Sequence, residues 1–263
     1  MRLRDKVALV TGSTTGIGEA IARCFAREGA RVMVHGLETA EGEQVVRAIR
    51  EAGPGEADFL PGDLEAPETA ADLVEKTVAR FGGIHILVNN AALKTRSDLE
   101  TTDAAVFDRM MAVNLRAPLL LIRACLPHFR RAGGGSVLNI GSVNGYCGER
   151  NQLAYALSKG GLMTLSRNLA DAYGPEGIRV NHFNVGWVLT ANEYALKVKE
   201  GLPEDWPEHV SRTFAPSGRL LSPEEIAYFA LMFVADEAAR INGAVVELEQ
   251  YPMIGRNPAK STD

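Results

Sequence analysis

Tyr155 and Lys159 are the residues of this chain whose types and spacing point most directly to chemistry. They are four positions apart, so a helix would place both side chains on one face. A phenol has a pKa of about 10, too high for proton exchange at neutral pH, and a nearby ammonium favours the phenolate. The pair can therefore serve as an acid/base catalyst. On spacing alone, a surface Tyr–Lys pair is the simpler interpretation.

A glycine-rich turn supplies a second motif and changes that balance. The turn reads Thr11-Gly12-Ser13-Thr14-Thr15-Gly16-Ile17-Gly18, and a predicted helix follows it directly. Glycines allow a tight turn and close approach of a pyrophosphate, and a helix N-terminus offers free N–H groups and a positive dipole end. Alone, such a turn is equally a plain loop. Its place between a strand and a helix predicts dinucleotide binding, and the Gly-Lys-Ser/Thr ending of a P-loop is missing from it.

The elements that must position these residues alternate along the chain. Apolar runs predict seven strands, at residues 7–10, 31–35, 58–60, 84–88, 136–140, 178–183 and 244–248. Helical patterns lie between them, at residues 19–28, 40–51, 67–81, 103–131 and 152–173. This alternation indicates an α/β fold of the Rossmann type, with a doubly wound parallel sheet covered on both faces. We expect one domain over residues 1–250 and a polar C-terminal tail over 251–263.

Residues 190–216 interrupt the alternation. This segment is irregular in pattern, and Gly201-Leu202-Pro203 and Trp206-Pro207 break any helix within it. It follows the carboxyl end of a predicted strand, where open α/β sheets bind ligands. We therefore expect residues 190–216 to form a mobile lid.

The motifs in combination make the sequence resemble the short-chain dehydrogenase/reductase family in its typical single-domain form. The resemblance extends from about Lys6 to Glu249, in the family's order and spacing. Its motifs are the glycine turn, Asn89-Asn90-Ala91-Ala92, Asn114 within Val113-Asn114-Leu115, Ser142, and Tyr155 with Lys159. The resemblance implies an NAD(P)-dependent enzyme that interconverts a secondary alcohol and a ketone by hydride transfer.

The resemblance also implies a role for each catalytic residue. Tyr155 would exchange a proton with the reacting oxygen, and Ser142 would orient that oxygen. Lys159 would bind the nicotinamide ribose and lower the pKa of Tyr155. Asn114 would anchor a water that relays the proton to solvent, although it is equally a buried residue at a helix kink.

The glycine turn and several later positions are implied as cofactor contacts. Asn90 and Ala91 would meet the adenosine ribose, and Asp63 with Leu64 the adenine, although turns favour aspartate for their own reasons. The nicotinamide would meet Gly186, Val188 and Thr190. The family commonly has proline where Val185 stands here, which leaves the local turn conformation open.

The end of the second predicted strand, His35-Gly36-Leu37-Glu38, concerns the choice between NAD and NADP. NADP-preferring relatives often have basic residues where Leu37 and Thr15 stand, so no group is evident here to pair with a 2′-phosphate. NAD-preferring relatives usually have an acid where Gly36 stands. Glu38 lies two positions later and either bonds the ribose or begins the next helix as a surface residue. We expect NAD, with NADP as the alternative.

Walls for a substrate are expected from residues 144–152, residues 92–96 and the lid. The candidate contacts are Asn144, Tyr146, Asn151, Gln152, Trp187 and Tyr194. Their amides suit a sugar, a polyol or a hydroxy acid. Trp187, Trp206 and Phe214 suit an apolar substrate equally well, or form the packing core of the lid. The mixed charges of the lid give no special support to a strongly anionic ligand.

Composition excludes several other classes. Lys+Arg 28 against Asp+Glu 33 gives a net charge of −5, which argues against binding nucleic acid through its phosphates. We expect no signal peptide, no membrane span and no metal site, because neither a long apolar run nor a paired ligand spacing of the five histidines is present. Cys24, Cys125 and Cys147 predict buried thiols in a reducing cytoplasm. The resemblance implies a homotetramer or dimer formed through helices around 103–131 and 152–173.

Two alternatives use the same fold. A non-catalytic dinucleotide-binding sensor would keep the glycine turn but could lose Tyr155 or Lys159. Retention of both, together with Ser142 and Asn114, favours the enzyme. An epimerase or dehydratase would also use the tyrosine and a bound nicotinamide.

Overall fold

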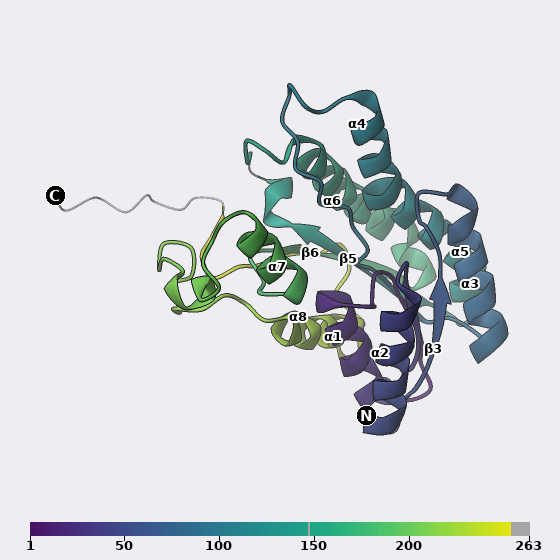
Figure 1. Cartoon of the computed structure of the whole chain (residues 1–263). Helices are drawn as coiled ribbons and strands as arrows, with labels where there is room; N and C mark the ends of the chain where they lie inside the picture. The colour runs from purple at the N-terminus through teal and green to yellow at the C-terminus, as the bar shows by residue number, and fades with distance from the viewer. Residues whose placement is uncertain (147, 254–263) are drawn as a thin grey trace.

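A single sheet of seven parallel strands lies at the centre of the computed structural model, which describes residues 1–146 and 148–253 (Figure 1). The strands are β1 (Val7–Val10), β2 (Arg31–Gly36), β3 (Glu56–Pro61), β4 (Ile86–Asn89), β5 (Gly135–Ser142), β6 (Ile178–Val185) and β7 (Val245–Leu248). Their order is β3-β2-β1-β4-β5-β6-β7, and all pairs are parallel. The order reverses between β1 and β4, which is the position where sheets of this type bind ligands. The predicted Rossmann-type sheet is confirmed.

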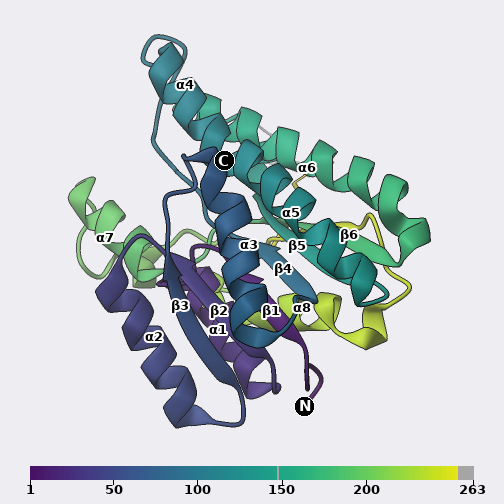
Figure 2. The same cartoon turned by 90° about the vertical axis from the view of Figure 1, so that its right-hand side faces the viewer.

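Helices cover both faces of the sheet (Figure 2). In the described residues the α-helices are α1 (Gly16–Arg27), α2 (Thr39–Ala52), α3 (Pro67–Phe81), α4 (Ala104–Met111), α5 (Ala117–Arg131), α6 (Leu153–Tyr173), α7 (Ala191–Lys199) and α8 (Pro223–Val234). Side chains of α1, α2 and α8 share one apolar core with the sheet, and those of α3, α5 and α6 share the other. The sheet is therefore the middle of three layers.

The two cores explain why β1 is apolar at every position. In β1, Ala8 and Val10 belong to the core under α1, whereas Val7 and Leu9 belong to the core under α3 and α5. Successive residues of a strand point to opposite faces, so a strand covered on both faces needs apolar residues throughout.

The predicted helix over residues 103–131 is two helices joined by a π-helical turn at Ala112–Arg116. Such turns insert one extra residue into the helical repeat and often mark functional positions. The whole stretch Ala104–Arg131 is long enough and apolar enough to cross a membrane, by length and composition alone. The expectation that no stretch of the sequence has such a length and hydropathy was therefore wrong for this stretch. Half of its most apolar window is buried, which is the pattern of a core helix.

Helix α8 was not predicted. Ser222 accepts a hydrogen bond from the backbone N–H of Glu225, and the Glu225 carboxylate accepts one from the N–H of Ser222. This reciprocal cap, with Pro223 in the first turn, is a strong helix start. The residues that follow it pack against α1 and the sheet.

The lid was predicted to be irregular throughout, and this was wrong for its first part. Thr190 caps α7 by accepting a hydrogen bond from the N–H of Glu193. The helix breakers Gly201 and Pro203 fall after α7 ends, and a short 3₁₀ turn follows at Trp206–His209. Of the cysteines, Cys24 and Cys125 are buried and unpaired as predicted, whereas Cys147 and residues 254–263 of the tail lie outside the described residues.

Candidate active site

Tyr155, Lys159 and Ser142 meet at the carboxyl edge of the sheet. Ser142 is the last residue of β5, and α6 packs against β5 and β6 with Tyr155 and Lys159 on its buried face. The Ser142 hydroxyl is hydrogen-bonded to the Tyr155 phenol. Lys159 Nζ lies 5.6 Å from the centroid of the Tyr155 ring and donates a hydrogen bond to the Ile140 carbonyl at 2.8 Å. All three side chains are buried.

Burial dominates the titration of Tyr155. The pKa of the phenol is raised to about 12, mainly by burial and to a smaller extent by the carboxylates of Glu193 and Glu149, against the lowering effect of the hydrogen bond from Ser142. Lys159 was expected to lower this pKa, but the net direction here is upward. Burial and the charge of Lys94 lower the pKa of Lys159 itself to about 8.

Asn114 lies in the π-helical turn and is fully buried. Its side chain accepts a hydrogen bond from the N–H of Leu93 at 2.8 Å and donates one to the Leu93 carbonyl at 2.9 Å. It also donates to the Ser158 hydroxyl on α6 at 3.0 Å. Asn114 therefore joins the kinked helix, the loop after β4 and the catalytic helix, and its part in a water relay stays a prediction.

The glycine turn forms a cradle that only glycine can make. Gly12 and Gly16 both have φ of +59°, and a Cβ on Gly12 would lie 2.7 Å from Ala91 Cα. A Cβ on Gly18 would overlap the Gly12 carbonyl oxygen and lie 2.5 Å from Asn90 Nδ2. Thr15, the N-cap of α1, makes no side-chain cap hydrogen bond, so its helix N-terminus is available to an anion. These residues fit a dinucleotide pyrophosphate.

Several predicted cofactor contacts instead support the turn from behind. The Asn90 amide donates hydrogen bonds to the carbonyls of Thr11 and Gly12 at 3.0 and 2.8 Å. The buried Ser13 hydroxyl donates to the Val10 carbonyl and accepts from the N–H of His35. Ile17 packs against the core. Direct contact between a cofactor and Asn90 or Ser13 stays a prediction.

At the end of β2, Thr14 occupies the space that a side chain on Gly36 would need. The Thr14 hydroxyl donates to Glu38 at 3.3 Å, and Glu38 is the N-cap of α2. The Leu37 side chain is 60% exposed. An acid at position 36 is therefore excluded sterically, and the nearest carboxylate belongs to Glu38.

The other predicted cofactor positions line the same edge. Asp63 accepts a hydrogen bond from the N–H of Glu65 in the turn after β3, and Leu64 is buried beside it. Glu249 occupies the Cβ space of Gly186 and accepts a hydrogen bond from the N–H of Trp187. Val188 is buried. A cavity of about 540 Å³ lies between the first turns of α1, α7 and α8, and Gly16 and Thr190 are among the residues that line it.

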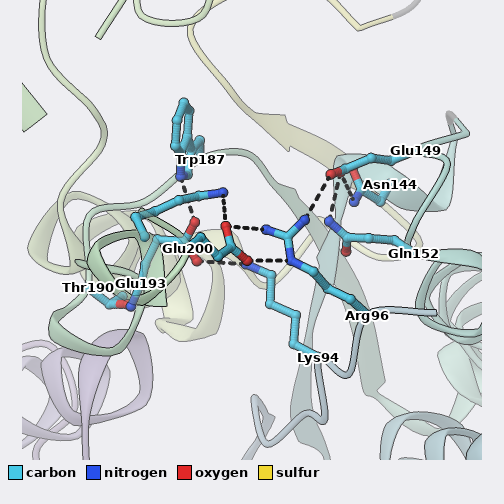
Figure 3. Close-up of polar contacts among 10 residues, drawn as sticks. Lys94, Arg96, Asn144, Glu149, Gln152, Trp187, Thr190, Glu193 and Glu200 are labelled. Atoms are coloured by element: carbon cyan, nitrogen blue, oxygen red, sulfur yellow. Dashed lines mark hydrogen bonds and ion pairs between the residues drawn. The ribbon is translucent and has the colours of Figure 1, made fainter. Parts of the chain in front are cut away.

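The predicted substrate walls are linked by charged residues whose pairing the sequence did not reveal (Figure 3). The Asn144 and Gln152 amides donate to one oxygen of Glu149, at 3.0 and 2.7 Å. Across the site, Lys94 and Arg96 from the loop after β4 reach the lid. Their partners are Glu193 and Glu200, at 3.0 and 2.8 Å. Of the remaining candidates, Asn151 and Tyr146 are half-buried.

Trp187 belongs to the packing core of the lid, whereas Tyr194 stacks on that core but stays exposed. Trp187 stacks on Trp206 with ring centroids 5.6 Å apart, and Tyr194 stacks on the same ring at 6.4 Å. Phe214 meets Trp187 edge to face. The indole N–H of Trp187 donates to Glu193 at 2.9 Å, so this residue acts by holding a carboxylate.

A buried histidine, His182, packs against strand β5, which carries Ser142. His182 on β6 fills the space that a side chain on Gly141 would need. Its Nε2–H donates to Asn184 at 2.9 Å, its Nδ1 lies 3.1 Å from the Ser166 hydroxyl of α6, and burial lowers its pKa to about 4. The neutral ring thus links α6 to the sheet beneath Lys159.

We expect Gly141→Ala to lower the free energy of unfolding by about 1–3 kcal/mol, because the added methyl overlaps His182. In a His182→Ala background the same change should cost less, because the ring is gone. Chemical denaturation of the four proteins of this double-mutant cycle measures the coupling. Strict additivity would show that the two positions do not compete for space.

No group of three or more His, Cys, Asp or Glu side chains suitable for a metal ion occurs among residues 1–146 and 148–253.

Comparison with known proteins gives consistent matches over nearly the whole chain. A family model described as enoyl-(acyl carrier protein) reductase matches residues 12–249. An L-rhamnose-1-dehydrogenase of Scheffersomyces stipitis is 36% identical, over 92% of this chain and 93% of the relative. A D-beta-hydroxybutyrate dehydrogenase of Rhizobium meliloti is 31% identical, over 93% and 97%. The crystal structure of a 3-oxoacyl (acyl-carrier-protein) reductase from Agrobacterium tumefaciens C58 with NADP bound superposes with a TM-score of 0.86, at 31% identity over 94% of this chain and 93% of the other.

Proposed function

The chain belongs to the short-chain dehydrogenase/reductase family, and from that premise we propose that it interconverts a secondary alcohol and a ketone with a nicotinamide dinucleotide. The observation that carries the proposal is the buried group of Tyr155, Ser142 and Lys159 at the sheet edge beside the glycine cradle. The substrate is a small hydroxylated molecule, in the class of sugars, polyols and hydroxy acids. The amides of Asn144 and Gln152 on its predicted wall support this class.

The residues divide the chemistry between them. Tyr155 gives its phenolic proton to the carbonyl oxygen in reduction and takes a proton from the alcohol in oxidation. Ser142, already hydrogen-bonded to the phenol, holds the reacting oxygen within reach of it. Lys159 would hold the nicotinamide ribose. The ammonium form of Lys159 stabilises the phenolate of Tyr155. A bound nicotinamide supplies or accepts the hydride.

We propose NAD as the preferred cofactor. Leu37 and Thr15 offer no positive charge for a 2′-phosphate, and the Glu38 carboxylate, held by Thr14, disfavours one. The similar reductase structure from Agrobacterium tumefaciens C58 has NADP bound, so the cofactor in that protein is not the one proposed here.

Titration with NADH and with NADPH, followed by nicotinamide fluorescence, tests both the cofactor and its preference. We expect NADH to bind about tenfold or more tightly than NADPH, because of the missing phosphate partner. Leu37→Arg should reverse much of this difference. Tighter binding of NADPH by the wild type would refute the preference, and binding of neither would contradict the proposed function.

The alternatives predict different outcomes in an alcohol screen. A dinucleotide-binding sensor would bind NADH and turn over no alcohol with NAD or NADP. An epimerase or dehydratase would convert substrate without net change in the nicotinamide absorbance. The retained Tyr155, Ser142 and Lys159 favour the dehydrogenase over the sensor.

We also propose a cytoplasmic homotetramer or homodimer with residues 1–250 as one domain. Unpaired Cys24 and Cys125 suit a reducing compartment. Phe107, Leu119 and Leu157 are exposed large apolar residues on α4, α5 and α6, the helices expected at the interface. Light scattering of the purified protein measures the assembly.

A further inference from the structure

The first turn of the lid helix places a buried carboxylate near the catalytic tyrosine. Glu193 on α7 has a side chain only 9% exposed. One of its oxygens accepts the indole N–H of Trp187 at 2.9 Å, and the other lies 3.0 Å from Lys94 Nζ. A buried carboxylate is costly unless it is paired and hydrogen-bonded, and Lys94 and Trp187 offset that cost for Glu193.

A second carboxylate approaches the tyrosine from the opposite wall. Glu149, in the loop between β5 and α6, is held by the amides of Asn144 and Gln152 (Figure 3). Glu193 and Glu149 both act on Tyr155 through space, raising its pKa. Glu193 on the lid is buried, and the more exposed Glu149 on the body is bonded to Asn144, whose backbone N–H donates to the Ser142 hydroxyl, so one carboxylate lies on each side of the site.

A third acceptor lies on the same wall as Glu149. Gln152 is 94% buried, since its exposed fraction is 6%, and its Nε2 is committed to Glu149. Its Oε1 finds no hydrogen-bond partner among the described residues. A buried carbonyl oxygen without a donor is unfavourable, and a hydroxyl group is the donor that would satisfy it.

Lys94 and Arg96, the two cations that face the lid, are already paired with acids, and the ammonium of Lys159 is assigned to the ribose. Lys94 pairs with Glu193, and the Arg96 guanidinium lies between Glu200 at 2.8 Å and Glu149 at 3.9 Å. A substrate carboxylate could gain Lys94 or Arg96 only by displacing one of these acids, and it would then lie beside Glu193 and Glu149. A neutral molecule avoids both costs.

We propose that the substrate is a neutral polyhydroxylated molecule, a sugar or polyol, and that Glu193 and Glu149 accept hydrogen bonds from hydroxyl groups next to the reacting carbon. The proposal rests on the dehydrogenase function above and specifies its substrate class. Lys94 and Trp187 hold the Glu193 carboxylate in place on the lid side of the site. Sites built to bind a hydroxyl reject analogues that lack it, so a deoxy compound should be a poor substrate.

The test compares neutral aldoses and alditols with hydroxy acids of similar size, by initial rates with NAD and with NADP. We expect the best neutral polyol to exceed the best hydroxy acid in kcat/KM. In Glu193→Gln, KM for that polyol should rise about tenfold or more with a smaller change in kcat, because a charge-assisted hydrogen bond is weakened. Glu149→Gln should act in the same direction.

Glu200→Gln is the matched control. It also removes a carboxylate of the lid region that is ion-paired to the body, but the Glu200 side chain is 32% exposed, against 9% for Glu193. Its KM should stay within about threefold of the wild type, since exposed ion pairs contribute little. A thermal unfolding midpoint for each variant separates loss of the hydrogen bond from loss of the fold.

The outcomes separate this inference from the function on which it rests. Preference of the wild type for hydroxy acids, or improved hydroxy-acid oxidation in Glu193→Gln, would overturn the inference, because Glu193 would then be occupying the place of a substrate carboxylate on Lys94. Equal effects of Glu193→Gln and Glu200→Gln on KM would also overturn it. Absence of turnover with every alcohol would overturn the dehydrogenase function and this inference with it.

Discussion

Tyr155→Phe is expected to lower turnover by about a thousandfold or more, because the substitution removes the phenol proposed to exchange a proton with the reacting oxygen. Binding of NADH should change little, since the ring and its packing are kept. Tyr173→Phe, the same chemical change at the other end of α6, is the matched control and should leave turnover unaltered. Steady-state rates and nicotinamide fluorescence measure the two quantities. Substantial turnover by Tyr155→Phe would refute the assigned acid/base.

Tyr155 also determines whether the rates of oxidation and reduction rise or fall with pH. Oxidation needs the phenolate, and the surroundings raise the pKa of Tyr155 to about 12. The fraction of phenolate therefore grows as pH rises through the alkaline range below that pKa, so oxidation by the wild type should accelerate with pH. Reduction needs the phenol, which is protonated at neutral pH, so its rate should be nearly flat there. In Tyr155→Phe the alkaline rise in oxidation should disappear, and persistence of that rise would assign it to another group.

Gly18→Ala is expected to abolish measurable NADH binding and to destabilise the fold. The added methyl would overlap the Gly12 carbonyl and crowd the Asn90 amide, so the turn that receives the pyrophosphate must open. Gly53→Ala is the matched control, because Gly53 has an extended backbone and open space around its Cβ position. Fluorescence titration with thermal unfolding measures both effects. Tight NADH binding by Gly18→Ala would contradict the location of the cofactor site.

The sequence alone was sufficient for the architecture of this protein. Short strands rich in apolar residues between helical patterns predict a parallel sheet, because strands covered on both faces do not need a regular polar and apolar alternation. The motifs around Gly12, Ser142 and Tyr155 are also local, since each follows a strand or lies on one helical face. Local spacing therefore predicted which residues gather at the sheet edge.

Helix α8 shows where a local signal was present but not used. Ser222, Pro223 and Glu225 form a recognisable helix start, and α7 begins with a similar cap at Thr190. Gly201 and Pro203 suggested that no helix forms in the lid, but they end a helix that is already complete. Capping residues would have corrected both predictions without a structure.

Other features depended on contacts between residues far apart in the chain. Only the fold could show that Thr14 occupies the place of a side chain at Gly36, or that His182 requires glycine at position 141. The pKa of Tyr155 rises because burial outweighs the hydrogen bond from Ser142, and burial depends on the packing of whole layers.

The charged residues of the site divide in the same way. The sequence predicted that residues 92–96, residues 144–152 and the lid form the walls of the site. Tertiary structure alone decided that Lys94 meets Glu193 across 99 positions of sequence while Glu149 is held by amides of its own loop. Such pairings depend on side-chain reach and burial in three dimensions, for which spacing along a chain carries no signal. In the proposal above, these pairings also favour a neutral substrate over an anionic one.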